Sequence, residues 1–290
     1  MSQNPNLISN VSLSVACLTD IDRTLTLQKS IKNTLDTYSK EELKNLRLVD
    51  LGTGTGILGY TALQQGVGYV SLVDHIKENI FLVEKITNEL GFKKIKNKGR
   101  NTKLYSREFE GYTQHLEIHK EDAKKYKPSK EFYNLDKRVF IDLVICELWD
   151  THMRFEDQIP VLKNVKKYTH DNTIYAPEKN ELVVTVYDKN NKPLSEDISI
   201  GFVDYKNPIE NDFSFSGFFK PNLDGLATKF KLSDILYFSD GTIMNGMGYT
   251  TPSRFIDIPF GEKELKRNSS FQLLTKFQFN DSRFNGYYLF

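Results

Sequence analysis

The sequence predicts an α/β domain with a mostly parallel sheet, followed by an antiparallel β domain. Three observations support this fold class: a glycine-rich turn between an apolar strand and a helix at residues 46–65, a second strand and helix at 69–90, and alternating apolar and polar residues beyond residue 180. Strands that alternate with helices form parallel sheets, whereas short alternating strands separated by turns form antiparallel ones. We expect the two domains to span residues 1–178 and 179–290.

The first half of the α/β domain carries the clearest pattern. Residues 46–51 (LRLVDL) form an apolar run, which is followed by GTGTG and a predicted helix over 57–65. A second apolar strand ends in Asp74, and a helix over 78–90 has apolar side chains at three- and four-residue spacing, with Gly91 in the position of a C-cap. The apolar positions of that helix are Phe81, Leu82, Val83, Ile86 and Leu90.

The next part of the chain is less regular. Residues 92–138 contain one lysine-rich cluster at 93–103 and another at 124–130, which we interpret as solvated loops and helix faces because the total charge is balanced. Regularity returns at 139–146 (VFIDLVIC), an apolar run typical of a strand buried on both faces. A helix is predicted over 159–168, with a proline tolerated in its first turn.

The composition changes near Pro177. Fourteen of the twenty phenylalanines lie after residue 180, and segments such as 182–187 alternate apolar and polar side chains. The turn signals DKNNKP, DGT and NDS recur between these segments, as they do in antiparallel β structure.

Charge and composition exclude several classes of protein. The 39 basic and 38 acidic residues leave a formal charge of +1. We therefore expect neither a nucleic-acid partner nor a cationic protein that binds membrane surfaces. No apolar run is long enough to span a membrane, and the first residues lack a signal-peptide pattern. Cys17 and Cys146 are the only cysteines, which argues against disulfides and a cysteine metal site; we expect a cytoplasmic protein without a metal.

The glycine-rich turn is the first candidate site. Gly52, Gly54 and Gly56 lie directly after the first strand, where glycine lets the backbone approach a ligand closely. Asp74 ends the next strand, 22 residues after Gly52, where an acid can bind the ribose hydroxyls of a nucleoside. The loop, the acid and the parallel-sheet pattern together predict a nucleoside site.

The segment VDLGTGTGILG resembles the first motif of class I S-adenosylmethionine-dependent methyltransferases. The resemblance implies a Rossmann-like core and S-adenosyl-L-methionine as cofactor. It also implies that Asp50 and Asp74 flank the methionine and ribose parts of the cofactor, and that Asp122, in IHKEDAKKY, lies beside the adenine amino group. The alternative for Asp122 is one acid among many in a charged loop.

Two glutamates form the second candidate site. CELWDTHMRFED places Glu147 at the end of the buried strand and Glu156 nine residues later. This stretch resembles the paired-glutamate loop of protein arginine methyltransferases. Two carboxylates can hold a planar guanidinium through charge-assisted bonds, and a guanidinium is a poor nucleophile near neutral pH unless its charge is directed away from the reacting nitrogen.

The resemblance runs from about residue 17 to residue 188. LTDIDRTLTLQKSI is similar to the family's segment in which an arginine grips the cofactor carboxylate, and Arg23 fills that position. THDNTIYAPEKNELVVTVYD is similar to the family's transition from the core to its β-barrel. The resemblance implies an N-methyltransferase with catalytic Glu147 and Glu156. It also implies an acceptor arginine in a protein, in a peptide or as the free amino acid, and a possible homodimer.

Several positions depart from the family pattern. The threonine-histidine-tryptophan loop of the barrel is absent, since the sole tryptophan is Trp149, and residues 1–16 contain no paired tyrosines. Arg154 replaces an apolar residue inside the glutamate loop, and the chain after Asp188 indicates a shortened barrel or a fragment. Two alternatives therefore stay open: transfer to another small amine or nucleophile, and a non-catalytic scaffold that kept the core.

Overall fold

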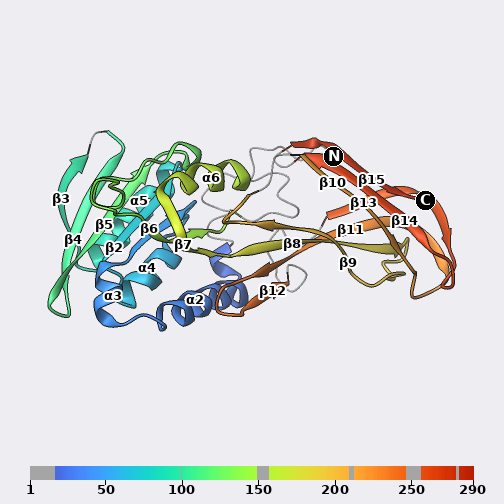
Figure 1. The fold of residues 1–290 in the computed structure, drawn as a ribbon, viewed down its shortest axis with the longest axis horizontal. Helices are drawn as coiled ribbons and strands as arrows, with labels where there is room; N and C mark the ends of the chain where they lie inside the picture. Colours follow the sequence, from blue (N-terminus) through green and yellow to red (C-terminus); the bar gives the residue numbers. More distant parts are fainter. Residues whose placement is uncertain (1–16, 99, 149–156, 209–211, 246–255, 279–280) are drawn as a thin grey trace. The chain divides into compact units, whose positions relative to one another are not determined.

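The computed structural model describes residues 17–98, 100–148, 157–208, 212–245, 256–278 and 281–290. The chain divides into two compact units (Figure 1). The first unit comprises residues 1–148, 160–178 and 238–242, and the second comprises 149–159, 179–237 and 243–290.

A seven-stranded sheet forms the centre of the first unit. Its strands lie in the order β3-β4-β5-β2-β1-β6-β7, and the pairs β1/β2, β1/β6, β2/β5 and β6/β7 are parallel. The mostly parallel sheet that the sequence predicts is therefore confirmed. The strands are β1 (Arg47–Leu51), β2 (Tyr69–Asp74), β3 (Lys93–Lys98), β4 (Thr102–Phe109), β5 (Tyr112–Lys120), β6 (Ile141–Cys146) and β7 (Thr169–Ala176).

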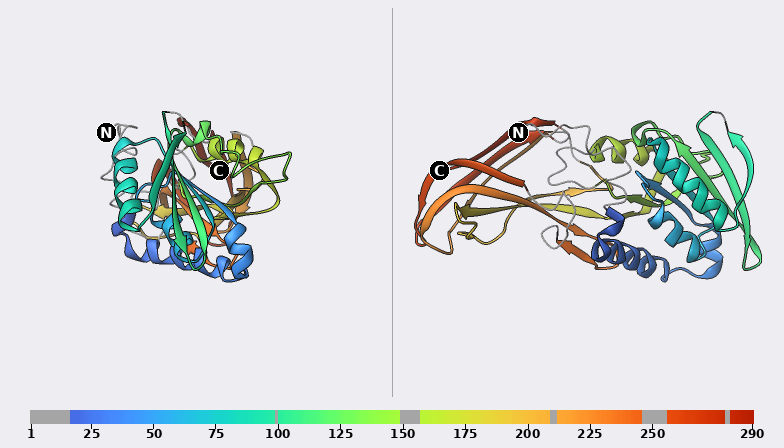
Figure 2. Two further views of the ribbon diagram at one scale, coloured as in Figure 1. Left: turned by 90° about the vertical axis from the view of Figure 1, so that its left-hand side faces the viewer. Right: turned by 180° about the vertical axis from the view of Figure 1, so that it is seen from behind.

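Helices cover both faces of this sheet. Figures 1 and 2 show α2 and α4 on one side of the sheet and α6 on the other. The Tyr60 hydroxyl of α4 donates to the Val83 carbonyl of α5 at 2.6 Å, so these two helices lie side by side. The helices are α2 (Ile21–Leu35), α3 (Lys40–Asn45), α4 (Ile57–Gln64), α5 (Lys77–Glu89) and α6 (Gln158–Val165).

The buried side of α5 differs from the predicted one. Ile80, Val83 and Thr87 are buried, whereas Phe81 is 72% exposed. Residues at three- and four-residue spacing share one helix face, and the stripe through Val83 begins at Ile80. The prediction that Phe81 belongs to the apolar face was therefore wrong. Phe81 follows the buried Ile80, and consecutive residues of a helix point about 100° apart, so Phe81 points away from the buried face.

The lysine-rich cluster at 124–130 lies in a 3₁₀ turn and loop, as expected, but the same interpretation of the cluster at 93–103 was wrong. Strands β3, β4 and β5 lie within residues 93–120, and β3/β4 and β4/β5 are antiparallel. Glu110 and Gly111 connect β4 to β5 with φ angles of +44° and +88°, the positive pair that a tight two-residue hairpin requires. The lysines of β3 hid the strand from apolar periodicity, because β3 lies at the edge of the sheet and its described side chains are exposed.

The second unit is built from antiparallel strands, as predicted. One sheet has the order β12-β11-β8-β9, with β13 paired to β11, and a three-stranded sheet has the order β10-β14-β15. Phe230 and Leu232 of β11 are fully buried. The strands are β8 (Lys179–Asp188), β9 (Ile198–Asp204), β10 (Asp212–Phe219), β11 (Gly225–Tyr237), β12 (Ile243–Asn245), β13 (Ile256–Leu265), β14 (Phe271–Gln278) and β15 (Asp281–Leu289).

Within the described ranges, no helix combines the length and the apolar character needed to span a membrane.

Candidate functional site

Four acidic side chains lie along one edge of the seven-stranded sheet. Asp50 belongs to β1, Asp74 ends β2, Asp122 follows β5 and Glu147 follows β6. These four strands are parallel, so their carboxyl ends meet at the same edge. The chain winds outward from β1 to β5 and then returns to β6 on the other side of β1. Open α/β sheets bind their ligands at such a switch point.

The glycine loop follows β1 at this edge. Gly52, Gly54 and Gly56 have φ angles of +74°, +55° and +81°, which residues with a side chain rarely adopt. A Cβ atom at Gly52 would lie 2.3 Å from Leu148 Cδ2, directly after Glu147. The missing side chain therefore allows the loop to pack against the segment that carries the candidate catalytic acid.

Asp74 is buried and binds the glycine loop directly. Its carboxylate accepts hydrogen bonds from the Gly54 amide at 2.9 Å, the Ile76 amide at 2.8 Å and the Asn79 side-chain amide at 3.0 Å. An ionised carboxylate offers about four acceptor positions, so one remains for a ligand. The three bonds hold the carboxylate in a fixed orientation at the edge of the sheet.

Asp50 is fully buried beneath the loop. Its Oδ2 atom accepts from the Thr53 hydroxyl at 2.6 Å and from the Gly59 amide at 3.2 Å. Burial raises the pKa of Asp50 to about 7; the bonds from Thr53 and Gly59 oppose this shift, and the charges of Glu147 and Asp74 add to it. Asp50 thus connects β1 to α4. It lies close enough to Glu147 and Asp74 for their negative charges to raise its pKa.

The raised pKa of Asp50 predicts how stability depends on pH. Between about pH 4 and about pH 7 the folded chain keeps a proton that the unfolded chain has released, so the free energy of unfolding falls as the pH rises. At about 1.4 kcal/mol per pKa unit, the loss between pH 5 and 7 is about 2–3 kcal/mol. Asp50→Asn, which cannot titrate, should lose that much less than the wild type in urea unfolding at the two pH values. Exposed Asp136→Asn is the control, and equal losses in all three proteins would contradict the assignment.

Arg23 and Glu147 form an ion pair, although 124 residues separate them. The Arg23 side chain is 4% exposed and that of Glu147 17%. Arg23 Nη1 also lies 3.5 Å from the Cys17 sulfur. Burial alone would lower the pKa of the Arg23 guanidinium, but Glu147, assisted by Cys17 and Asp20, outweighs this effect and raises it. The structure thus places a fixed cation beside the glutamate that follows β6.

A buried group that sequence reasoning missed lies at the end of β5, the strand that Asp122 follows. His119 Nε2 is 3.1 Å from Glu117 and its Nδ1 is 3.2 Å from Glu121. Burial alone would lower the pKa of His119, but these two glutamates outweigh it and raise it. Because carboxylates only accept hydrogen bonds, an imidazolium that donates from both nitrogens satisfies the group. The signal in the sequence is an acid, a histidine and an acid at every second position, which share one face of a strand.

Asp122 is less tightly connected to the site than the other described candidates. The Asp122 carboxylate accepts from the Lys124 amide at 2.9 Å and is half-exposed, without a hydrogen bond to the other described candidates. Glu156 lies outside the described residues, as does Arg154. Within the part of the chain that the structure describes, no group of three or more histidine, cysteine or acidic side chains is placed to hold a metal ion.

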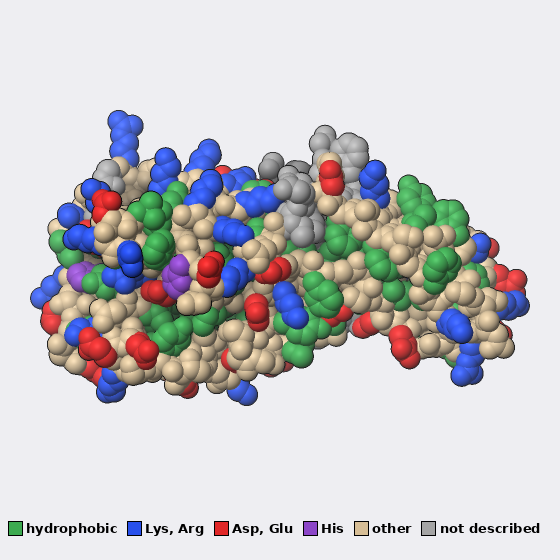
Figure 3. All heavy atoms as spheres, viewed as in Figure 1, with side chains coloured by type: hydrophobic (Ala, Val, Ile, Leu, Met, Phe, Trp, Pro, Cys, Tyr) green, Lys and Arg blue, Asp and Glu red, His purple; other side chains and the backbone are tan. Residues whose placement is uncertain are grey.

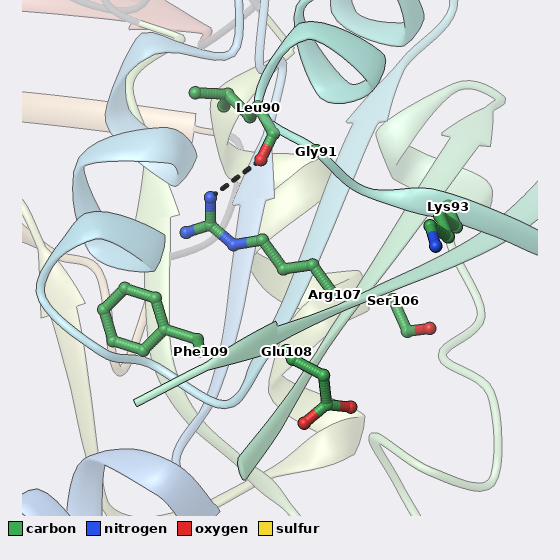
Figure 4. Close-up of a pocket in the computed structure, with 7 residues that line it drawn as sticks. All are labelled: Leu90, Gly91, Lys93, Ser106, Arg107, Glu108 and Phe109. Atoms are coloured by element: carbon green, nitrogen blue, oxygen red, sulfur yellow. Dashed lines mark hydrogen bonds between the residues drawn. The ribbon is translucent and has the colours of Figure 1, made fainter. Parts of the chain in front are cut away.

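A separate cavity of about 540 Å³ lies between the end of α5 and β4 (Figure 4). Its most distinctive side chain, Arg107, donates to the Leu90 carbonyl at 3.0 Å and to the Gln114 side chain at 2.8 Å. The guanidinium also lies over the rings of Phe92 and Phe109, at 4.6 and 5.2 Å from their centres. Arg107 therefore ties β4 to the end of α5, and none of the candidate site residues lines this cavity.

Comparison with solved structures identifies the family of proteins whose fold this chain shares. No family model matches the sequence, and no curated protein matches it. Among solved structures, the chain is similar to the Trypanosoma brucei PRMT1 enzyme–prozyme heterotetrameric complex with AdoHcy, with a TM-score of 0.70, 13% identity and coverage of 97% of this chain and 98% of that one. It is also similar to PRMT6 with SAH, with a TM-score of 0.67, 11% identity and coverage of 97% and 99%. The chain therefore has the fold of the protein arginine methyltransferases along nearly its whole length.

Proposed function

We propose that this protein is an S-adenosylmethionine-dependent methyltransferase that acts on a guanidino nitrogen of arginine, in a protein, in a peptide or as the free amino acid. The observation that carries the proposal is the position of Glu147. Glu147 directly follows β6, next to Leu148, which packs against the glycine loop, and its carboxylate is ion-paired with the guanidinium of Arg23. Both similar structures are complexes with S-adenosylhomocysteine, the demethylated form of the cofactor, which supports the same class of reaction.

The residues at the sheet edge fit an adenosine that carries an amino acid. The remaining acceptor position of Asp74 suits a ribose hydroxyl, and the Arg23 guanidinium suits a carboxylate, as its bond to Glu147 illustrates. Asp122 would accept from the adenine amino group, and Asp50 would hold the loop of Gly52, Gly54 and Gly56 in shape. When bound, the cofactor supplies a methyl group on a sulfonium.

Glu147 and Glu156 would hold and orient the acceptor. Carboxylates attract the positive charge of a guanidinium toward the nitrogens they bind, which leaves lone-pair density on the nitrogen that faces the methyl group. The nitrogen–carbon bond forms as the carbon–sulfur bond breaks, and the methylated guanidinium then loses one proton to restore its charge. Alignment at about 3–3.5 Å between the reacting atoms contributes most of the remaining rate enhancement.

The direct test is formation of S-adenosylhomocysteine by the full chain. Incubation with S-adenosylmethionine and an arginine-rich peptide, free arginine or simple amines should give product with an arginine acceptor, and intact-mass spectrometry should show the added methyl groups. Product with simple amines alone would move the assignment to another acceptor. Calorimetry that detects no binding of S-adenosylmethionine would favour a scaffold, and light scattering tests whether the chain forms the homodimer that the resemblance implies.

Asp74→Ala should weaken binding of S-adenosylhomocysteine. A hydrogen bond to a charged group contributes about 1.5–3 kcal/mol, so the dissociation constant should rise about 10- to 150-fold in calorimetry. Asp74 also holds the Gly54 amide, so part of the loss will come from the loop. Asp74→Asn keeps the shape and one acceptor oxygen and should lose less. Wild-type affinity in Asp74→Ala would remove the ribose assignment.

A further inference from the structure

Basic side chains are concentrated on one part of the first unit. We call this surface the basic ridge and define it by residues 93–103, 120–130 and 163–167. These three segments contain fourteen lysines and arginines and two acidic residues, a formal charge of +12, whereas the whole chain carries +1. The rest of the chain therefore carries −11, and the balanced total conceals a strong separation of charge.

The fold brings the three segments together. The turn between β3 and β4 is attached to the end of β5, because the Lys120 amide donates to the Asn101 carbonyl at 2.8 Å. The loop after β5 is attached to α6 through Asn164, whose side-chain amide donates to the carbonyls of Ala123 at 3.2 Å and Tyr126 at 3.0 Å. Figure 3 shows the blue side chains gathered along the upper border of the first unit.

Most of these basic side chains are exposed. Lys103 pairs with Glu84, and Lys124 lies 3.6 Å from Asp122. The exposed lysines without an ion pair to any described residue include Lys93, Lys94 and Lys96 on β3, and Lys120, Lys125 and Lys127 at the end of β5 and in the following loop. Like charges at this density repel one another, and an anionic partner would relieve that repulsion.

Two ordinary explanations account for only part of the ridge. Lysines on an edge strand prevent unwanted strand pairing, which explains those on β3. Ten of the fourteen basic residues lie outside β3, however, so edge protection does not explain them. For the same reason, an acidic peptide that paired with β3 as an additional strand would leave most of the basic side chains of the ridge without an anionic partner. A long partner with regularly repeated charges matches all three segments.

We propose that the basic ridge binds the phosphate backbone of a nucleic acid, without reading its bases. Lysine is a point charge suited to phosphate, and binding of this kind depends on the number of phosphates contacted rather than on sequence. The proposal is independent of the methyltransferase assignment, because it rests on the lysines and arginines of the ridge; Asp122 lies within the second segment but is not one of them. It replaces the expectation, based on total charge, that the protein has no nucleic-acid partner.

Fluorescence anisotropy of the full chain tests the proposal. The probes are labelled single-stranded RNA and DNA of about 20 nucleotides, their duplexes, and a glutamate-rich peptide of matching charge. Two variants remove the ridge in part: Lys93→Glu/Lys94→Glu/Lys96→Glu and Lys120→Glu/Lys125→Glu/Lys127→Glu. The control, Lys189→Glu/Lys192→Glu/Lys220→Glu, makes the same change in net charge at exposed positions of the second unit.

We expect nucleic-acid binding that is insensitive to base sequence and that weakens steeply between about 50 and 200 mM salt. Each ridge variant should weaken binding at least tenfold and reduce the slope of log affinity against log salt by about 2, with little change in the control. Equal binding by ridge and control variants would overturn the proposal, and so would a peptide that binds as tightly as the nucleic acids, since it would indicate an acidic protein partner. Thermal melts check folding, and the corresponding glutamine variants replace any triple that fails to fold.

Discussion

Glu147→Gln should reduce methyl transfer to arginine about 10²- to 10³-fold. The amide cannot balance the positive charge of a guanidinium, and its amino group presents a donor where the acceptor needs only hydrogen-bond acceptors. Loss of one preorganised contact in the transition state corresponds to about 2.7–4 kcal/mol. The fold should survive, because the amide oxygen of glutamine can still accept a hydrogen bond from Arg23. Turnover is measured as formation of S-adenosylhomocysteine.

Two further variants make this result specific. Glu156→Gln should cause a loss of the same order if both glutamates hold the acceptor. Glu78→Gln, an exposed acid in the first turn of α5, should leave turnover unchanged. Calorimetry should show that all three proteins keep their affinity for S-adenosylhomocysteine. Normal turnover in both Glu147→Gln and Glu156→Gln would reject arginine as the acceptor.

Arg23→Met should destabilise the protein and weaken cofactor binding together. Removing one member of a buried ion pair costs about 3–5 kcal/mol, because the remaining charge stays without compensation. Glu147 is 17% exposed and keeps some hydration, so we expect a smaller cost of about 2–3 kcal/mol, at or just below the lower end of that range. The dissociation constant for S-adenosylhomocysteine should rise at least tenfold if Arg23 binds the cofactor carboxylate. Urea unfolding and calorimetry measure the two effects.

A double variant separates the ion pair from the cofactor contact. Arg23→Met/Glu147→Gln removes the uncompensated carboxylate and should recover part of the lost stability, whereas the cofactor affinity should stay low. Arg100→Met, a change of the same type at an exposed turn, serves as the control and should alter neither quantity. If Arg23→Met is as stable as Arg100→Met, the ion pair contributes nothing to the folded state. If it binds the cofactor product normally, another group holds the carboxylate.

The strand–loop–helix units of the first unit were predictable, because their signals are local. Strand β1 is a short apolar run whose side chains are buried on both faces, and the glycines after it adopt positive φ angles that favour glycine. Asp74 could be placed at the end of β2 by counting residues from the loop. The prediction failed where the signal was polar: β3 is an exposed edge strand rich in lysine, and β5 buries Glu117 and His119, which look like surface residues in a sequence.

The sequence by itself determined the strand–loop–helix units around the glycine loop, the loop itself and the acids at the ends of neighbouring strands, since periodicity and turn chemistry depend on residues close together in the chain. Tertiary structure alone decided which distant groups meet. Arg23 reaches Glu147 across 124 residues because α2 packs beside α4 and β6 pairs with β1. Three lysine-rich segments, each unremarkable alone, form one surface because β4 pairs with β5 and Asn164 joins α6 to the loop. Composition averages charge over the whole chain, whereas the electrostatic field at a surface depends on where the fold places each charge.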